Sequence, residues 1–358
     1  MRRPRIAMTM GDVAGIGPEI IARVCADRPL RESCRPLVIG HPRILERALK
    51  LVGADLSVTP AAGPGDLDDA DAPAHRSDSV PCWNPTDDAA AEVPSGRIDA
   101  RAGEAAFTYL VAATQAALDG SIDAIATAPL NKAALYESGH RYPGHTEILA
   151  EVCEAREFAM MLHLPQGGVV GSPHGLSVAH VTLHTSIQSV PELLSPSGVT
   201  ETARLLDAFL KGIGCRSPRI GVCALNPHAG ERGLFGTEEQ TVIAPAVSAV
   251  QSDGIRAVGP IPADTLFQRA VAGEFDGVVA MYHDQGHIAI KLIGFERAVN
   301  ITLGLPIVRT SPSHGTAFDI AWQGQARPDG MREAVRIAAL LAEHRQTVPT
   351  GNRLNSGR

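Results

Sequence analysis

Short apolar runs alternate along the chain with stretches in which apolar residues recur at helical spacing. The runs of strand length cover residues 5–10, 36–40, 123–128, 158–164, 176–183, 220–225 and 277–282. The helical stretches cover residues 18–24, 44–52, 103–118, 148–153, 197–210, 238–251 and 331–344. Residues 54–99 lack periodicity and predict a loop-rich edge with one strand. The alternation predicts an α/β fold in which helices are layered on sheets.

Three of the apolar runs are followed by a histidine, namely His184, His228 and His283. Polar side chains beyond the ends of neighbouring strands gather at one edge of an α/β sheet, which suggests one shared site. Neutral imidazole is a common ligand of divalent metals, and three such ligands leave positions for water or substrate. His180 would share a strand face with His184, so spacing does not choose between them. The alternative for each histidine is a hydrogen-bonded structural role.

Further polar and charged residues near these histidines suggest a small anionic substrate: Lys291, Arg309, Asn300 and Asp264. Arginine makes bidentate contacts with phosphate or carboxylate, and lysine adds a compact charge. His145 and Thr146 precede a predicted helix, whose free amides can bind an anion. The alternative is that Thr146 only caps that helix. The residues alone therefore indicate a metal-dependent enzyme acting on a small anion.

Length and composition narrow the class of protein. A chain of 358 residues exceeds the usual single core and predicts two lobes. The net charge of −7 argues against a nucleic-acid partner. None of the six cysteines forms a C-x-x-C pair, and no apolar run reaches the ~18 residues that a membrane span needs. We expect a cytoplasmic protein without a membrane partner, whose polar end after Thr347 is frayed.

Longer motifs recur in a fixed order along nearly the whole chain, at residues 10–12, 14–19, 127–132, 144–147, 225–231, 262–267, 281–286, 299–306, 309–311 and 314–317. In this order they resemble the family of NAD-dependent 4-hydroxythreonine-4-phosphate dehydrogenase and its relatives. The resemblance implies an isocitrate/isopropylmalate dehydrogenase-like fold, with two α/β/α lobes around a central cleft. Residues 1–137 and 305–358 would form the lobe with both termini. Residues 138–304 would form the lobe with the metal-ligand histidines and the dimer interface.

The resemblance also implies roles for individual residues. A divalent metal (Zn, Mg, Co or Mn) would be held by His184, His228 and His283 across a homodimer interface, with His180 outside the set. On this basis His283 would meet the other two ligands only across the subunit boundary, Asp284 would orient a ligand, and His287 would be structural. The substrate would contact His145, Thr146, Lys291, Asn300 and Arg309. NAD, with NADP as the alternative, would lie against Leu303, Gly304, Leu305, Pro306, His314, Gly315 and Thr316.

The implied reaction is oxidation, with decarboxylation, of a 4-phosphorylated 3-hydroxy acid. Lys291 is the candidate for catalytic proton transfer, with Asp264 near the reacting end. The first-choice substrate is 4-hydroxy-L-threonine 4-phosphate, on the route to pyridoxal phosphate. Departures from the family pattern at Val13, residues 185–187 and residues 234–236 also fit catabolic 4-phospho-D-threonate or D-erythronate dehydrogenases and aromatic cis-dihydrodiol carboxylate dehydrogenases. The alternatives from other classes are a metal- and phosphate-binding module without turnover, and a hydrolase.

Overall fold

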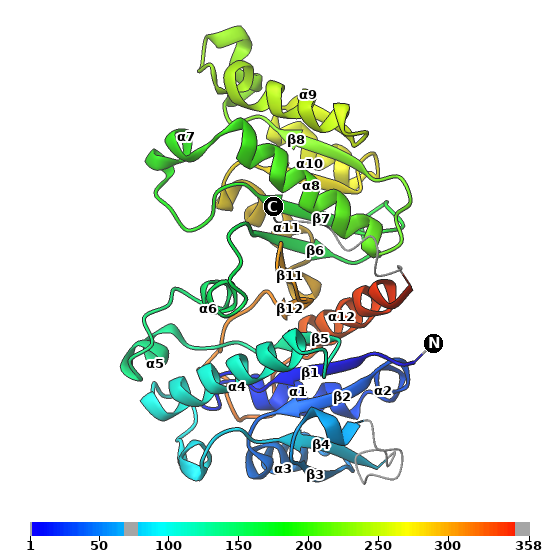
Figure 1. Cartoon of the computed structure of the whole chain (residues 1–358). Coiled ribbons are helices and arrows are strands. Elements are labelled where there is room, and N and C mark those ends of the chain that lie inside the picture. Colours follow the sequence, from blue (N-terminus) through cyan, green and yellow to red (C-terminus); the bar gives the residue numbers. More distant parts are fainter. Residues whose placement is uncertain (1, 68–77, 348–358) are drawn as a thin grey trace. The chain divides into compact units, whose positions relative to one another are not determined.

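The computed structural model describes residues 2–67 and 78–347, and the chain divides into two compact units. The first unit comprises Met1–Arg156 and Leu305–Arg358, and the second comprises Glu157–Gly304. Each unit is a sheet with helices packed on it, which confirms the predicted α/β class (Figure 1). The tail after Thr347, expected to be frayed, lies outside the described residues. No helix within the described ranges has the length and hydropathy needed to span a membrane.

The sheet of the first unit is parallel throughout. Its strand order is β3 (Ser57–Ala61), β4 (Ser79–Trp83), β2 (Arg35–Ile39), β1 (Arg5–Thr9), β5 (Ala124–Thr127) and β12 (Arg309–Pro312). Strands β1 and β5 are buried along their whole length, as expected for continuous apolar runs inside a parallel sheet. The helices of this unit are α1 (Gly17–Ala26), α2 (Arg28–Ser33), α3 (Pro42–Leu51), α4 (Ala100–Leu118), α5 (Lys132–Glu137), α6 (His145–Val152) and α12 (Asp329–Thr347), with 3₁₀ turns η1 (Pro64–Leu67) and η3 (Asp88–Glu92).

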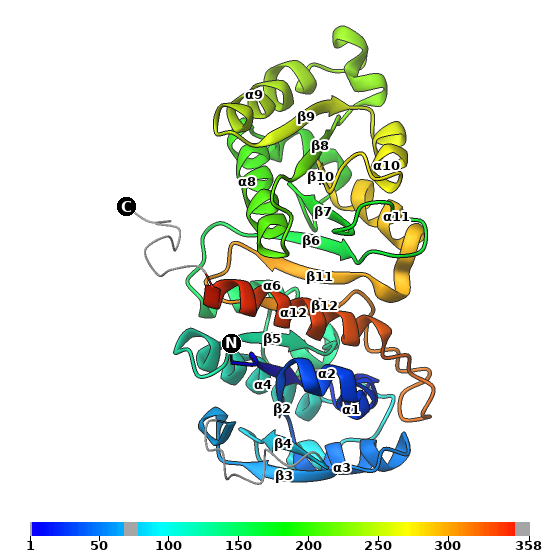
Figure 2. The ribbon, with the colours of Figure 1, turned by 90° about the vertical axis from the view of Figure 1, so that its right-hand side faces the viewer.

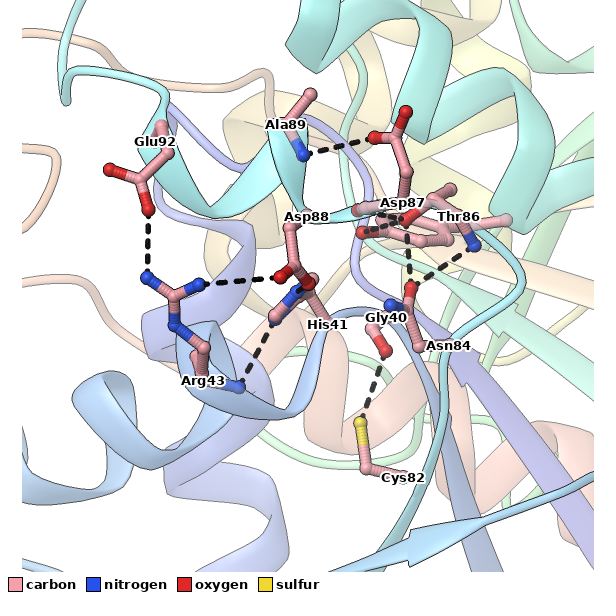
Figure 3. A network of polar contacts seen from close by, with 11 residues as sticks. Gly40, His41, Arg43, Cys82, Asn84, Thr86, Asp87, Asp88, Ala89 and Glu92 are labelled. Atoms are coloured by element: carbon pink, nitrogen blue, oxygen red, sulfur yellow. Dashed lines mark hydrogen bonds and ion pairs between the residues drawn. The ribbon is translucent and has the colours of Figure 1, made fainter.

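The 54–99 segment, expected to hold one strand, contains both β3 and β4. A polar network fixes its end to the end of β2 (Figure 3). His41 Nδ1 accepts a hydrogen bond from the Arg43 amide at the start of α3, and His41 Nε2 lies 2.9 Å from Asp88 Oδ1. Arg43 also pairs with Glu92, 2.7 Å away. His41 therefore caps a helix and anchors a loop, which is a structural role.

The sheet of the second unit is mixed. Its strand order is β11 (Val299–Leu303), β6 (Ala159–Leu164), β7 (Leu176–His180), β10 (Gly277–Ala280), β8 (Arg219–Cys223) and β9 (Arg256–Ile261). The β11–β6 and β6–β7 pairs are antiparallel, whereas β7, β10, β8 and β9 run parallel. Figure 2 shows α8 (Pro196–Gly212) and α9 (Ala244–Ser252) on one side of these strands and α10 (Ala263–Val271) and α11 (His283–Gly294) on the other. The remaining elements are α7 (Val190–Leu193), the 3₁₀ turns η4 (Ile187–Ser189), η5 (Pro227–Gly233) and η7 (Phe295–Arg297), and a π-helical turn η6 (Glu239–Ile243).

The first division between the units falls after residue 156, whereas the sequence placed it after residue 137. The difference is the segment that contains α6. Ile148 and Leu149 on this helix are buried in the apolar core of the first unit, and α6 packs against α4. This packing keeps residues 138–156 with the first unit.

Candidate active site

Two of the predicted metal ligands lie together at the carboxyl edge of the second unit's sheet. His283 begins α11 directly after β10, and His184 follows β7, the strand that pairs with β10. Their ring centroids are 5.6 Å apart. Both histidines line a pocket of about 410 Å³ together with Tyr282 and Asp284. One chain therefore brings His184 and His283 together, which corrects the expectation that His283 meets both other ligands only across a subunit boundary.

The ring of His283 is oriented by its neighbour in the chain. His283 Nδ1 lies 2.7 Å from Asp284 Oδ1. An ionised carboxylate only accepts hydrogen bonds, so Nδ1 carries the proton and Nε2 keeps its lone pair. Pairing a histidine with a carboxylate in this way fixes the tautomer and raises the basicity of a metal ligand. The donor set of His184 and His283 thus fits a divalent metal.

A second pair of histidines packs behind His283. His180 Nδ1 lies 3.1 Å from the Met160 carbonyl, so it donates there, and His180 Nε2 accepts from His287 Nδ1 at 3.2 Å. The His287 ring stacks on His283 with centroids 3.7 Å apart. Burial lowers the pKa of His180 to about 4 and that of His287 to about 3, so both are neutral at pH 7. A Cβ on Gly286 would collide with His180.

The sequence left His180 outside the set of metal ligands and gave His287 a structural or peripheral role. The strand expected over residues 176–183 ends at His180, so His180 and His184 do not share an extended strand. His180 faces the interior and is 1% exposed. His287 stands one helical turn after His283, and this i, i+4 spacing is the signal that could have placed it.

The third predicted ligand, His228, lies apart from this pair. It is exposed in η5, where five successive residues from His228 to Arg232 have φ between 41° and 74°. Left-handed backbone costs roughly 1–2 kcal/mol per non-glycine residue, so this turn is strained. Within the described residues, no set of three or more histidine, cysteine, aspartate or glutamate side chains is arranged to hold a metal. A single chain therefore does not assemble the expected three-histidine site, because the chain leaves β8 through this turn.

Lys291 stands on α11 beyond the histidines. It lines a pocket of about 390 Å³ with His283, Asp284 and His287. Its Nζ lies 5.7 Å from the ring centroid of Phe295. Lys291 and His283 therefore line the same pocket.

Two further predicted residues of this unit lie elsewhere. Asp264 is exposed in the first turn of α10 and lines neither pocket. Asn300 lies in β11, where its Nδ2 donates weakly to Met160 Sδ at 3.6 Å. Its buried Oδ1 has no hydrogen-bond partner among the described residues. Asn300 thus keeps an acceptor for a ligand. Asp264 does not line a pocket with the histidines.

The first unit carries a separate buried cationic group. Arg309 begins β12, is 2% exposed, and donates to Thr127 Oγ1 at 2.8 Å. Burial lowers the pKa of Arg309 to about 9, with Glu147 acting in the opposite direction. Burial and the guanidinium of Arg309 hold the pKa of His145 well below its usual range. A buried guanidinium beside a neutral imidazole is a strong site for a phosphate or carboxylate.

Helix α6 begins within this group. Its N-cap is Gly144, and no side chain caps the helix. The alternative that Thr146 only caps the helix is therefore wrong. Thr146 instead lies buried in the first turn, next to His145, where the helix presents free amides.

The residues expected to bind the cofactor fall in two places. Leu303 ends β11 and Gly304 to Pro306 follow it; Leu303 and Leu305 are buried, and a Cβ on Gly304 would collide with the Glu157 carbonyl. His314 to Thr316 form a loop after β12, and the Thr316 carbonyl accepts from the Ile16 amide. His314 Nδ1 is 3.1 Å from the Gly315 carbonyl, which leaves Nε2 as an acceptor.

Two orphaned acceptors support the second place. His314 Nε2 is buried and has no partner among the described residues, and the same holds for Asp12 Oδ2 in the loop that contacts Thr316 through Gly15 and Ile16. Buried acceptors without partners fit a ligand that donates, such as the ribose hydroxyls of a dinucleotide. The 314–316 loop therefore fits a nicotinamide cofactor better than residues 303–306 do. In that latter segment, packing against the protein interior already accounts for the glycine and the two leucines.

Asp12 gives a prediction on stability. Burial raises its pKa to about 6 from an ordinary value of 3.8. The folded state then binds the proton more tightly than the unfolded state, so stability falls as pH rises from about 4 to 6 and is level above that. Asp12→Asn should remove this pH dependence, which amounts to about 3 kcal/mol in the free energy of unfolding. The stability of the variant relative to the wild type should therefore increase as pH rises from about 4 to 6. Urea unfolding between pH 4 and 8 measures it. Asp119→Asn, an exposed carboxylate that accepts from the Ser121 amide, is the control and should keep the slope.

The two-unit α/β architecture is shared with a β-decarboxylating dehydrogenase of known structure. The enzyme of that description from Thermococcus kodakarensis matches with a TM-score of 0.50 over 97% of this chain and 84% of that one, at 15% identity, which shows the fold alone. The chain belongs to the family described as pyridoxal phosphate biosynthetic protein PdxA, whose model matches residues 32–338. The expected family is thereby confirmed, and its named members are dehydrogenases.

Relatives in this family carry two names. The D-threonate 4-phosphate dehydrogenase of Cupriavidus necator is 46% identical over 96% of this chain and 98% of the relative. The 4-hydroxythreonine-4-phosphate dehydrogenase of Trichlorobacter lovleyi is 44% identical over 96% of this chain and 99% of the relative. The crystal structure of the 4-hydroxythreonine-4-phosphate dehydrogenase from Klebsiella pneumoniae matches with a TM-score of 0.81 and 41% identity, over 95% of this chain and 99% of that one.

Proposed function

We propose that this protein is an NAD-dependent, divalent-metal-dependent dehydrogenase that oxidises and decarboxylates a 4-phosphorylated 3-hydroxy acid. The observation that carries this proposal is the His184–His283 pair, with the His283 lone pair set free by Asp284. The buried Arg309 with His145 supplies a second charged group suited to a phosphate or carboxylate. The names of the relatives supply the class of substrate.

We infer that the metal is held by His184 and His283 of one chain and by His228 of a second copy. Two imidazoles leave a divalent ion short of ligands, and His228 is exposed on its strained turn. The outer face of α11 exposes Ile288 and Leu292, at 59% and 84%, and Phe295 at the start of η7 is 46% exposed. Large exposed apolar side chains around an incomplete site favour burial against a second copy, which gives a homodimer.

The chemistry that the bound groups supply is Lewis-acid polarisation of the substrate hydroxyl by the metal and acceptance of two electrons by NAD. Lys291 takes the proton of the C3 hydroxyl while the C3 hydrogen leaves with its electron pair. The resulting ketone lies β to the carboxylate, so the C1–C2 bond breaks, carbon dioxide leaves, and the electron pair is delocalised onto the C3 oxygen. The enolate then takes up a proton at C2 to give the product ketone. Arg309, His145, Thr146 and Asn300 bind and orient the substrate.

The two substrates for which the relatives are named differ only in the group at C2. D-threonate 4-phosphate carries a hydroxyl there, and 4-hydroxy-L-threonine 4-phosphate carries an amine. Leu234 follows Gly233 in this chain, where biosynthetic members of the family usually have histidine. Relatives named for D-threonate 4-phosphate reach 46% identity. We therefore place D-threonate 4-phosphate ahead of 4-hydroxythreonine 4-phosphate, which was the first choice from sequence.

An assay on a substrate panel tests this function. Metal-reconstituted protein and NAD are supplied with D-threonate 4-phosphate, D-erythronate 4-phosphate, 4-hydroxy-L-threonine 4-phosphate and an aromatic cis-dihydrodiol carboxylate. NADH formation should be fastest with D-threonate 4-phosphate. Turnover without NAD would identify a hydrolase, and no reaction with any of the four would contradict the dehydrogenase proposal.

Arg309 should govern affinity for the phosphorylated substrate. Arg309→Met removes charge-assisted hydrogen bonds in a buried site, so KM should rise about 100-fold or more. Unfolding should need at least as much urea as in the wild type, because a desolvated charge is removed. Arg336→Met is the control, since Arg336 pairs with Glu333 on the surface of α12. A KM that stays at the wild-type value would contradict this role.

A further inference from the structure

The strained turn that carries His228 is held at its base by one buried carboxylate. Glu239 is 3% exposed and lies in η6, after the turn. Its Oε1 accepts from the amides of Leu225 and Asn226, at 2.9 and 2.7 Å. Its Oε2 accepts from Asn226 Nδ2 at 3.0 Å. Three donors thus converge on one carboxylate where the chain leaves β8.

The same carboxylate touches the turn itself. A Cβ on Gly230, at the middle of the left-handed run, would lie 2.6 Å from Glu239 Oε2 and 3.1 Å from the Gly236 carbonyl. The backbone of the turn is therefore seated directly on Glu239. His228, Ala229, Glu231 and Arg232 have left-handed backbone, which persists only where surrounding contacts hold it in place. The contacts of Glu239 with this segment can hold it in that way.

We propose that Glu239 is a positioning residue for the metal site, which acts by fixing the left-handed turn that presents His228. The proposal rests on the proposed function, in which His228 is a metal ligand. Glu239 accepts from the backbone on one side of His228 and seats Gly230 on the other. The side chain of His228 is exposed, so the position of its imidazole depends on the conformation of the backbone that carries it.

Glu239→Gln is the decisive variant because it keeps the shape but replaces one acceptor oxygen with a donor. The new amide group must face either the two backbone amides or Asn226 Nδ2, and both are donors. Glu238→Gln is the matched control, since Glu238 accepts one hydrogen bond from Asn226 and does not contact Gly230. Glu239→Asp keeps the charge on a shorter side chain and should show a smaller effect.

The test is titration of the metal-free protein with Co²⁺, which gives a dissociation constant independent of turnover. Glu239→Gln should weaken Co²⁺ binding about 10- to 100-fold, with Glu239→Asp between it and the wild type and Glu238→Gln unchanged. In a His228→Ala background, Glu239→Gln should add no further weakening, because it acts through His228. Circular dichroism checks the fold of each variant.

The outcomes separate the two levels of the argument. If His228→Ala binds Co²⁺ as tightly as the wild type, the proposed metal site is wrong, and the role of Glu239 falls with it. If His228→Ala weakens binding but Glu239→Gln and Glu239→Asp do not, the metal site stands and the positioning role is wrong. If Glu239→Gln weakens binding equally with and without His228, its effect is a general loss of structure, which also overturns the proposal.

Discussion

Equal amounts of His228→Ala and His283→Ala, dissociated and reassociated together, should regain about a quarter of the wild-type activity. Each variant alone should be inactive. Half of the dimers that form contain one chain of each kind, and each of these has one complete metal site out of two. That site takes His184 and His283 from the His228→Ala chain and His228 from the other chain. The measurement is NADH formation as a function of the mixing ratio.

A second mixture provides the control for complementation. His184 and His283 lie together in one chain, with rings 5.6 Å apart. Mixing His184→Ala with His283→Ala should therefore restore no activity, because every site has lost a ligand. Recovery in this control, or none in the first mixture, would contradict a metal site shared in this way.

Lys291→Ala should lower kcat about 10²- to 10⁴-fold, the usual contribution of a group that transfers a proton. KM should change little, because Arg309, His145 and Thr146 supply most of the substrate binding. Lys291 is exposed, so the variant removes one amine without disturbing a buried contact. Steady-state kinetics on the metal-loaded variant separates the two constants.

Lys211→Ala is the matched control for Lys291. It removes an exposed lysine that forms an ion pair with the buried Asp207 on α8, in contact with neither pocket, and kcat should stay at the wild-type value. If Lys291→Ala retains wild-type kcat, Lys291 does not transfer the proton.

Periodicity in the sequence predicted most of the fold. The buried parallel strands of the first unit are continuous apolar runs, and burial on both faces makes such runs easy to recognise. The 54–99 segment was expected to hold one strand but holds two, β3 and β4. Strand β3 is short and partly exposed, so it leaves no clear hydrophobic pattern among the prolines and glycines.

The candidate site was predicted only in part. Its residue types followed from strand ends and from the family resemblance, but their grouping did not. The left-handed turn at His228 has no pattern beyond Gly230 and Gly233, because contacts with Glu239 determine it. The stacking of His287 on His283 depends on tertiary packing against His180. Distances between elements of this kind are not encoded in local spacing.

One measurement tests the central claim most directly, namely NADH and carbon dioxide formation from D-threonate 4-phosphate before and after removal of divalent metal by a chelator. We expect one NADH and one carbon dioxide per substrate consumed, loss of both on chelation, and recovery of both when metal is restored. Substrate consumption without NADH, or activity that survives complete metal removal, would contradict the proposed function.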